Sequence, residues 1–236
     1  MHNAAIIVAA GRGTRMGPNI DKLFLEVAGH PVIFHSWLRF DAADCIHEIV
    51  LVVRDGLQSA FVELANELRP SKPFRLVCGG KERQDSVWNG LSALGEGVQV
   101  VAIHDGARPC VTEELISRTI AVAGETGAAV AGQPVTDTIK ESSDGVVISQ
   151  HLDRGRLWSV QTPQCFRLDV IRRALSLVRE KELLVTDDTA ACEWIDQPVT
   201  LVEGQRPNPK VTVAEDLGSI ETILRSLEPR PRDKRG

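Results

Sequence analysis

Short hydrophobic runs alternate along the first part of the chain with stretches in which hydrophobic residues recur every three or four positions. Uninterrupted runs rich in branched side chains are typical of strands buried on both faces of a parallel sheet. They span residues 4–10, 48–53, 74–78, 98–104 and 128–133. The stretches with helical periodicity span residues 31–40, 56–68, 83–94 and 112–125. This alternation predicts an α/β fold with a doubly wound, mostly parallel sheet, whose ligands bind at the carboxyl ends of the strands.

The alternation changes near residue 133. The following residues, to about 154, switch to a period of two around the turn sequence SSDG, which predicts a β-hairpin that projects from the molecule. The main pattern then returns, with apolar runs at 157–166 and 198–204 and helices near 168–181, 187–195 and from 214. We expect one domain over residues 1–228 with an arm at about 134–155, followed by a disordered polar tail at 229–236.

Composition narrows the class of protein. The chain has 236 residues and a net charge of -5, which does not suggest a general nucleic-acid binder. Its five cysteines form no CxxC motif, so neither a disulfide framework nor a zinc site is indicated. The N-terminal run AAIIVAA lacks a preceding positive charge and leads into GRG, unlike a signal peptide. No run reaches the roughly 20 apolar residues of a membrane span. We expect a cytoplasmic protein without nucleic-acid or membrane partners.

The first hydrophobic run ends in the glycine-rich sequence GRGTRMG at residues 11–17. A Walker A loop would need a lysine after the last glycine, and a dinucleotide fingerprint would need GxGxxG, so both templates fit poorly. The glycines alone fit an ordinary turn equally well. Arg15 and Lys22, however, would repel one another unless an anion lay between them. The stretch therefore predicts backbone amides and two cations around a nucleotide triphosphate.

Seven motifs extend in order over nearly the whole chain. They are AAGRGTRMG with DKLFLEVAGHPVI, CGGKERQDSVWNGL (78–91), IHDGARPCV (103–111), VTDTIK (135–140), LDRGRLWSVQTPQCF (152–166), VTDDTAAC (185–192) and VEGQRPNPKVTVAEDL (202–217). Together they resemble the sugar-alcohol-phosphate cytidylyltransferase family, most closely its members that act on 2-C-methyl-D-erythritol 4-phosphate. Seven motifs in register make a chance resemblance very improbable.

The resemblance implies a Rossmann-like nucleotidyltransferase fold and a reaction of CTP with 2-C-methyl-D-erythritol 4-phosphate. The products would be 4-diphosphocytidyl-2-C-methyl-D-erythritol and pyrophosphate, in non-mevalonate isoprenoid precursor synthesis. It further implies Mg2+ or another divalent cation, and a homodimer in which the arm of one subunit completes the neighbouring active site. A projecting hairpin exposes strand edges, which a partner subunit commonly covers, and this supports the homodimer.

The same resemblance assigns the site residues. Catalytic roles fall on Arg15, Lys22 and Lys210. CTP contacts fall on Ala9, Ala10, Gly11, Gly13, Gly80, Lys81, Ser86, Asp105 and Gly106. Contacts to the sugar-alcohol phosphate fall on Asp105, Arg108, Thr138, Arg154, Thr162 and Thr186. Asp105 is also the metal ligand, since Mg2+ prefers one or two carboxylates together with phosphate oxygens.

Several of these residues have ordinary structural alternatives. Ser86 could simply cap the helix that it enters. Asp105 could form an ion pair with Arg108, three residues further on. Thr138 and Arg154, on a hairpin, would ordinarily be solvated side chains.

Similar alternatives apply near the C-terminus. Asp187 and Asp188 could be first-turn acids of a helix capped by Thr186. Lys210, judged by chemistry alone, would be a surface lysine. We expect His104 to be structural, because the attacking phosphate oxygen is already ionised at neutral pH and needs no general base.

Two positions depart from the family pattern. Gly106 stands where the family usually has alanine, which adds backbone freedom to that loop. Pro209 replaces the usual aliphatic residue before Lys210 and affects the direction from which the lysine approaches.

Three other functions fit the sequence less well. Transfer to D-ribitol 5-phosphate is the nearest alternative, because that sibling enzyme shares the glycine loop and the arm. A catalytically idle nucleotide-binding regulator would have little reason to retain the cationic residues and Asp105. An NAD-dependent oxidoreductase needs an acidic residue at the end of the second strand, and Asp55 lies about twice too far from the glycine loop.

Overall fold

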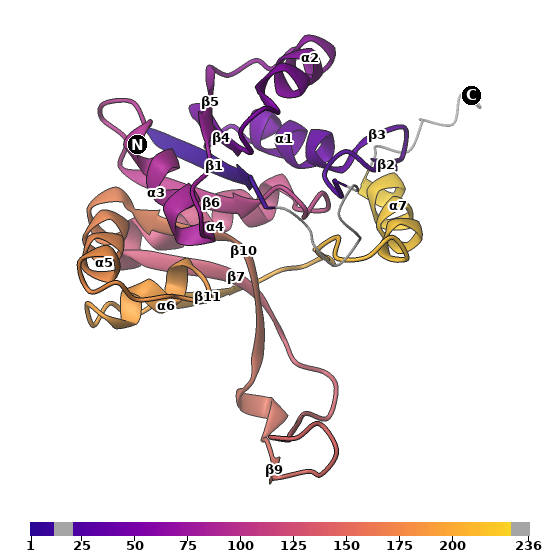
Figure 1. Cartoon of the computed structure of the whole chain (residues 1–236), viewed down its shortest axis with the longest axis vertical. Helices are drawn as coiled ribbons and strands as arrows, with labels where there is room; N and C mark the ends of the chain where they lie inside the picture. Colours follow the sequence, from indigo (N-terminus) through magenta and orange to yellow (C-terminus); the bar gives the residue numbers. More distant parts are fainter. Residues whose placement is uncertain (12–20, 228–236) are drawn as a thin grey trace, which may run out of the picture.

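A seven-stranded sheet runs through the centre of the computed structural model, which describes residues 1–11 and 21–227 (Figure 1). Its strand order is β11-β7-β10-β6-β1-β4-β5, and every neighbouring pair is parallel except the two made by β10. The bounds are β1 (Asn3–Ala9), β4 (Glu48–Val53), β5 (Phe74–Cys78), β6 (Val100–Asp105), β7 (Ala128–Pro134), β10 (Trp158–Arg167) and β11 (Thr200–Glu203). The predicted mostly parallel sheet is confirmed, and the five hydrophobic runs form β1, β4, β5, β6 and β7.

Helices cover both faces of this sheet. One face packs against α1, α2, α4 and α7, and the other against α3, α5 and α6. Their bounds are α1 (Val32–Ala42), α2 (Gln58–Leu68), α3 (Arg83–Ser92), α4 (Glu113–Thr126), α5 (Leu168–Glu180), α6 (Asp188–Glu193) and α7 (Asp216–Leu227). A small hairpin of β2 (Glu26–Val27) and β3 (His30–Pro31) precedes α1. Within the described residues, no helix has the length and apolar character needed to cross a bilayer.

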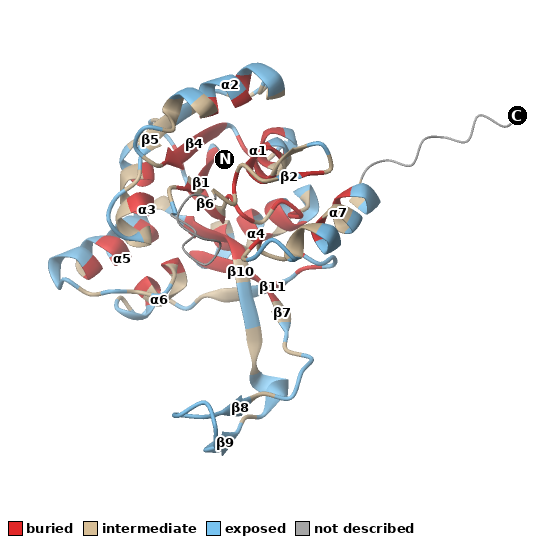
Figure 2. Cartoon of the chain, turned by 45° about the vertical axis from the view of Figure 1, so that its right-hand side comes forward, coloured by how far each residue is buried: buried red, intermediate tan, exposed pale blue. Residues whose placement is uncertain are grey.

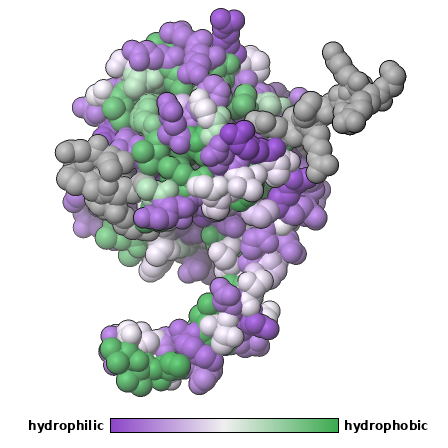
Figure 3. Space-filling model, turned by 90° about the vertical axis from the view of Figure 1, so that its right-hand side faces the viewer, coloured by the Kyte–Doolittle hydropathy of each residue, from purple (hydrophilic) through white to green (hydrophobic). Residues whose placement is uncertain are grey.

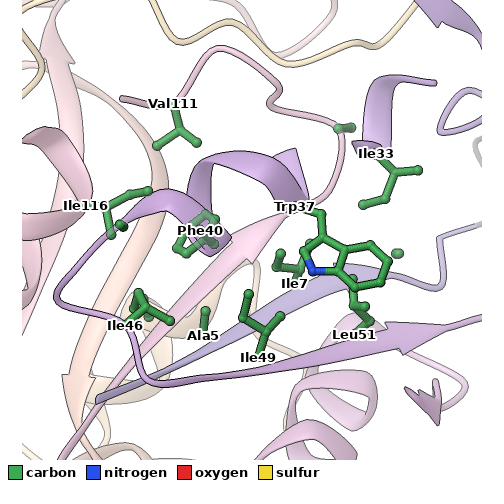
Figure 4. Packing of buried hydrophobic residues seen from close by; sticks show 14 of the residues in the cluster. Ala5, Ile7, Ile33, Trp37, Phe40, Ile46, Ile49, Leu51, Val111 and Ile116 are labelled. Carbon is green, nitrogen blue, oxygen red and sulfur yellow. The ribbon is translucent and has the colours of Figure 1, made fainter. Parts of the chain in front are cut away.

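The two hydrophobic layers explain why the strand sequences lack polar alternation. On the α1 face, Trp37 and Phe40 lie over Ile7, Ile49 and Leu51 of the sheet (Figure 4). All five side chains are at most 1% exposed. Because each strand also packs on its other face, alternate residues on both sides must be apolar.

The arm, residues 135–157, leaves the sheet at the end of β7 and returns into β10 (Figure 1). Nearly all of it is exposed (Figure 2). Its only strands among the described residues are β8 (Lys140–Glu141) and β9 (Gln150–His151), so the predicted β-hairpin is correct only over this short pair. No element of the described residues packs on either face of the arm, so its alternating pattern has no core to hold longer strands. The predicted tail at 229–236 lies outside the described residues.

Gly90 allows α3 to approach the sheet closely. A Cβ atom at this position would lie 2.7 Å from Ile6 Cγ2 and 3.0 Å from Val52 Cγ2. Gly218 of α7, in contrast, is exposed, and a Cβ there would meet no described atom within 4 Å. Packing therefore requires glycine at position 90 but not at position 218.

We expect alanine to act oppositely at these two positions. Gly90→Ala should lower the free energy of unfolding by about 1–3 kcal/mol, because the added methyl overpacks the α3–sheet contact. Gly218→Ala should raise it by about 0.5–1 kcal/mol, because it removes only the entropic cost of glycine in a helix. Urea unfolding of the three proteins measures both changes. A stabilised Gly90→Ala variant would contradict the close packing of α3.

Candidate active site

A cavity of about 700 Å³ opens at the carboxyl edge of the sheet, beside the ends of β1, β4, β5 and β6. This volume is in the range typical of small-molecule sites. Among the described residues, five cationic and three acidic side chains line it, and two of the cations, Arg54 and Arg83, pair with acids outside the lining, Asp21 and Asp188. The predicted site residues that line it are Ala10, Gly11, Lys22, Gly80, Lys81, Ser86, Asp105 and Lys210.

Two glycines shape the wall between β5 and α3. A Cβ on Gly79 would lie 2.3 Å from Ala10 Cβ, and one on Gly80 would lie 2.2 Å from Asp85 Cβ. Neither position therefore accepts a larger side chain without movement of the loop. The Gly80 amide donates to Ser86 Oγ at 3.0 Å, so Ser86 both supports this loop and lines the cavity.

Asp105, the last residue of β6, lies among three cations. Its Oδ2 is 2.6 Å from Lys210 Nζ and 3.9 Å from Arg108 Nε, and its Oδ1 is 3.5 Å from Arg83 Nε. Burial opposes ionisation, but the charges of Arg83, Lys210 and Arg108 outweigh it and hold the pKa of Asp105 well below its usual range. The expected ion pair between Asp105 and Arg108 exists, but it is the longest of the three ion pairs that Asp105 forms.

A chain of hydrogen bonds fixes the backbone of Asp105. Its amide donates to Thr162 Oγ1 at 3.1 Å, and Thr162 Oγ1 lies 3.0 Å from His104 Nδ1. His104 Nε2 lies 3.1 Å from the carbonyl oxygen of Arg108, which can only accept, so Nε2 carries the proton and Nδ1 accepts from the Thr162 hydroxyl. Burial lowers the pKa of His104 to about 4, so its imidazole is neutral at pH 7. His104 and Thr162 therefore support the backbone of Asp105 beside the cavity.

Arg83 is a cation of the site that sequence reasoning did not select. Its Nη1 lies 2.7 Å from Oδ2 of Asp188, which is fully buried at the start of α6. Burial opposes the charge of Arg83, but Asp188 and Asp105 outweigh it and raise the pKa of the guanidinium above its usual value. The motif GGKER contains Arg83, but the partner that orients it comes 105 residues later.

Lys22 and Lys210 are joined by the segment after β11. Lys22 Nζ donates to the carbonyl oxygen of Val211 at 3.0 Å, next to Lys210. The Val211 amide donates to the carbonyl oxygen of Ala107 at 2.8 Å. Arg108 Nη1 donates to the carbonyl oxygen of Asn208 at 2.8 Å. These bonds hold the segment, and with it Lys210, against the end of β6.

Gly106 is more firmly held than its sequence predicts. Its amide donates to the carbonyl oxygen of Val8 at 3.0 Å, and its own carbonyl accepts from Ser36 Oγ at 2.8 Å. A Cβ would lie 2.6 Å from Ile33 Cδ1, so Ile33 fills the space of the alanine methyl expected in the family. The expected extra backbone freedom is therefore absent, and these two backbone groups are already engaged.

The remaining predicted residues lie away from the cavity or outside the described part of the chain. Ala9 is buried in the core, and Thr186 is exposed before α6. Thr138 and Arg154 are exposed on the arm, where Arg154 Nη1 donates to the carbonyl oxygen of Thr136 at 2.7 Å. Two further predicted residues, Gly13 and Arg15, lie outside the described residues.

Known proteins match the chain over almost its full length. Residues 3–226 match the model of the family described as IspD, 2-C-methyl-D-erythritol 4-phosphate cytidylyltransferase. The enzyme of that name from Caldanaerobacter subterraneus subsp. tengcongensis is 42% identical over 226 residues, covering 95% of this chain and 100% of the relative. The corresponding Alkaliphilus oremlandii protein is 40% identical over 227 residues, covering 94% and 95%.

Solved structures give the same result. The 4-diphosphocytidyl-2C-methyl-D-erythritol synthase of Anaerococcus prevotii superposes with a TM-score of 0.84 at 30% identity, covering 95% of this chain and 96% of that one. The 2-C-methyl-D-erythritol 4-phosphate cytidylyltransferase of Thermus thermophilus has a TM-score of 0.77 at 31% identity, covering 95% and 100%.

The mostly parallel sheet with a cationic cavity at its carboxyl edge defines the chain as a nucleotidyltransferase with a Rossmann-like fold. Within that class, the extent of the matches is decisive. The chain belongs to the 2-C-methyl-D-erythritol 4-phosphate cytidylyltransferase family.

The buried neutral His104 predicts a pH-dependent stability. Its pKa in the folded chain, about 4, lies below the ordinary value of 6.5, so the unfolded chain takes up a proton in this interval that the folded chain excludes. The stability due to His104 is therefore fully present above pH 6.5 and lost as the pH falls to about 4. Between these values the unfolding free energy should fall by up to about 3 kcal/mol more than in His104→Gln. Urea unfolding at a series of pH values measures this difference, and parallel curves would contradict it.

Proposed function

We propose that the chain transfers the cytidylyl group of CTP to 2-C-methyl-D-erythritol 4-phosphate in isoprenoid precursor synthesis. The products are 4-diphosphocytidyl-2-C-methyl-D-erythritol and pyrophosphate. The observation that carries this proposal is the group of three cations, Arg83, Arg108 and Lys210, around an ionised Asp105 at the carboxyl edge of the sheet, in a chain of this family. Two polyanions must meet in this reaction, and a cationic cavity lowers their repulsion.

The triphosphate of CTP would bind beside Lys22 and the end of β1. Gly11 and Lys22 line the cavity there, and the resemblance adds Gly13 and Arg15. On the opposite wall, Gly80, Lys81 and Ser86 would contact the nucleoside, again by resemblance. The close approach of Gly79 to Ala10 brings these two walls together.

The reaction needs no covalent enzyme intermediate. An ionised phosphate oxygen of the acceptor forms a bond to the α-phosphorus of CTP, and the bond to the bridging oxygen of pyrophosphate breaks. Negative charge grows on the α-phosphate oxygens and on the leaving pyrophosphate, so fixed cations lower the barrier. Lys22 and Lys210 supply such charge, and Arg83 reinforces it from beside Asp105. Proton removal is not required, in keeping with the neutral, buried His104.

Asp105 fits a divalent cation that arrives with the triphosphate. It is ionised, lines the cavity, and is joined by no cluster of three or more His, Cys, Asp or Glu in the described residues. Mg2+ commonly binds through one or two carboxylates together with substrate phosphates. When bound, the cation would neutralise phosphate charge in the transition state. Lys210 and Arg83 orient the Asp105 carboxylate for this role.

We also infer a homodimer with composite sites. Thr138 and Arg154 do not line the cavity of their own chain, and the arm carries them away from the sheet (Figure 1). At the end of the arm, Val146, Val147 and Ile148 are 85%, 64% and 53% exposed, and Figure 3 shows this apolar cluster. An exposed apolar tip of this kind is commonly covered by a partner. The arm would thus reach a second subunit and present Arg154 to its acceptor phosphate.

The domain organisation and the cellular location complete the proposal. We infer a single domain over residues 1–228, because all described helices except the arm's short turn pack on one sheet. A cytoplasmic location is supported by five cysteines that all remain free thiols, as a reducing compartment would keep them.

The reaction is tested by pyrophosphate release from CTP and Mg2+ with either 2-C-methyl-D-erythritol 4-phosphate or D-ribitol 5-phosphate as acceptor. We expect rapid release with the first and little with the second. Lys22→Ala should lower kcat by roughly a hundredfold, the effect of losing one preorganised charge contact. Higher turnover with the ribitol acceptor would replace the proposed substrate, and unchanged turnover in Lys22→Ala would remove Lys22 from the mechanism.

The composite site is tested by mixing two inactive variants. Lys22→Ala damages the cavity of its own subunit, whereas Arg154→Ala damages the site of the partner. Reassociation of a 1:1 mixture gives mixed dimers in which one of two sites is intact, so about a quarter of wild-type activity should return. No recovery after confirmed subunit exchange would show that Arg154 acts within its own chain.

A further inference from the structure

Arg54 connects the two described residues that flank residues 12–20. It follows β4 directly and lines the cavity. Its Nη2 donates to Asp21 Oδ2 at 2.6 Å and lies 3.5 Å from the carbonyl oxygen of Gly11. We propose that Arg54 and Asp21 form one positioning unit that holds Lys22 toward the triphosphate. This inference rests on the proposed function of Lys22 and extends it to two residues outside the predicted site.

Asp21 uses its other polar atoms to form the turn that contains Lys22. Its Oδ1 accepts from the Leu23 amide at 3.1 Å, and its carbonyl oxygen accepts from the Phe24 amide at 3.0 Å. A carboxylate that accepts from a backbone amide two residues later is a common local device for fixing such turns. The ion pair with Arg54 therefore also fixes the orientation of the turn that contains Lys22.

The residues immediately before and after Lys22 are thus both anchored. Leu23 is 3% exposed and packs in the core, and its carbonyl accepts from the Ile33 amide at 3.0 Å. Asp21 is held by Arg54 on the preceding side. Between them, Lys22 Nζ donates to the carbonyl oxygen of Val211. Loss of the Arg54 contact would free one of the two anchors and let the ammonium group of Lys22 move.

The geometry favours this indirect role over an independent phosphate contact by Arg54. The carboxylate of Asp21 lies only 2.6 Å from the guanidinium and offsets much of its charge. The side chain of Asp21 is 18% exposed and that of Arg54 is 34% exposed, so water screens the pair only partly. Arg54 therefore contributes mainly by placing Asp21.

A set of single and combined variants separates the roles of Arg54, Asp21 and Lys22. Arg54→Ala removes the guanidinium, and Asp21→Asn breaks the ion pair but keeps an oxygen that can accept from the Leu23 amide. The double variant completes a cycle, and Lys22→Ala with and without Arg54→Ala tests whether the effect passes through Lys22. Arg75→Ala is the matched control, because it removes an ion pair of 2.9 Å with Glu48 that does not line the cavity.

We expect Arg54→Ala and Asp21→Asn each to lower kcat/KM for CTP about tenfold, and the double variant to lower it by about the same factor. Arg54→Ala should cause no further loss in the Lys22→Ala background. Asp21→Ala, which also removes the turn acceptor, should be more impaired than Asp21→Asn. Arg75→Ala should stay within about twofold of wild type, since it leaves the cavity intact.

Independent losses, with the double variant about a hundredfold impaired, would overturn the proposal, as would an undiminished effect of Arg54→Ala without Lys22. Titration calorimetry with CTP and Mg2+ provides the same cycle without turnover. Wild-type chain that binds CTP but releases no pyrophosphate would count against the proposed reaction, while the binding cycle would still decide whether Arg54 and Asp21 act through Lys22.

Discussion

A buried carboxylate must be balanced by positive charge, and this requirement organises the carboxyl edge of the sheet. Asp105 meets it with Lys210, Arg83 and Arg108, which come from the segment after β11, the start of α3 and the loop after β6. The three segments are separate in sequence, and their ion pairs with the Asp105 carboxylate hold them together in space. The same arrangement leaves cations beside the cavity, where a polyanionic ligand can use them.

The central sheet could be predicted because its strands are buried on both faces, which leaves long apolar runs in the sequence. The arm could not be predicted in detail. Its alternation resembles a half-buried hairpin, but neither face meets a core in the described part of the chain, where β8 and β9 are its only paired strands. Asp144 instead fixes the turn, since its Oδ1 accepts from the amides of Val146 and Val147 at 2.8 and 2.9 Å. Periodicity reports an exposed and a buried face only where a second layer exists.

The candidate site divides in the same way. Glycines and Asp105 could be predicted, because each lies at or just beyond the end of a recognisable hydrophobic run. Arg83 and Arg54 could not, since their roles depend on Asp188 and Asp21, which are 105 and 33 residues away. A residue that supports local structure can also line the cavity. Ser86, for example, supports the backbone of its loop and borders the cavity at once.

The reversed direction of β10 has a consequence for how this architecture can vary. Because β7 and β10 are adjacent and antiparallel, the chain leaves and re-enters the sheet at neighbouring positions. The excursion between them can lengthen or shorten without altering the order of the seven strands or the spacing of the cations. Divergence in the length of the arm is thereby uncoupled from the geometry of the cavity.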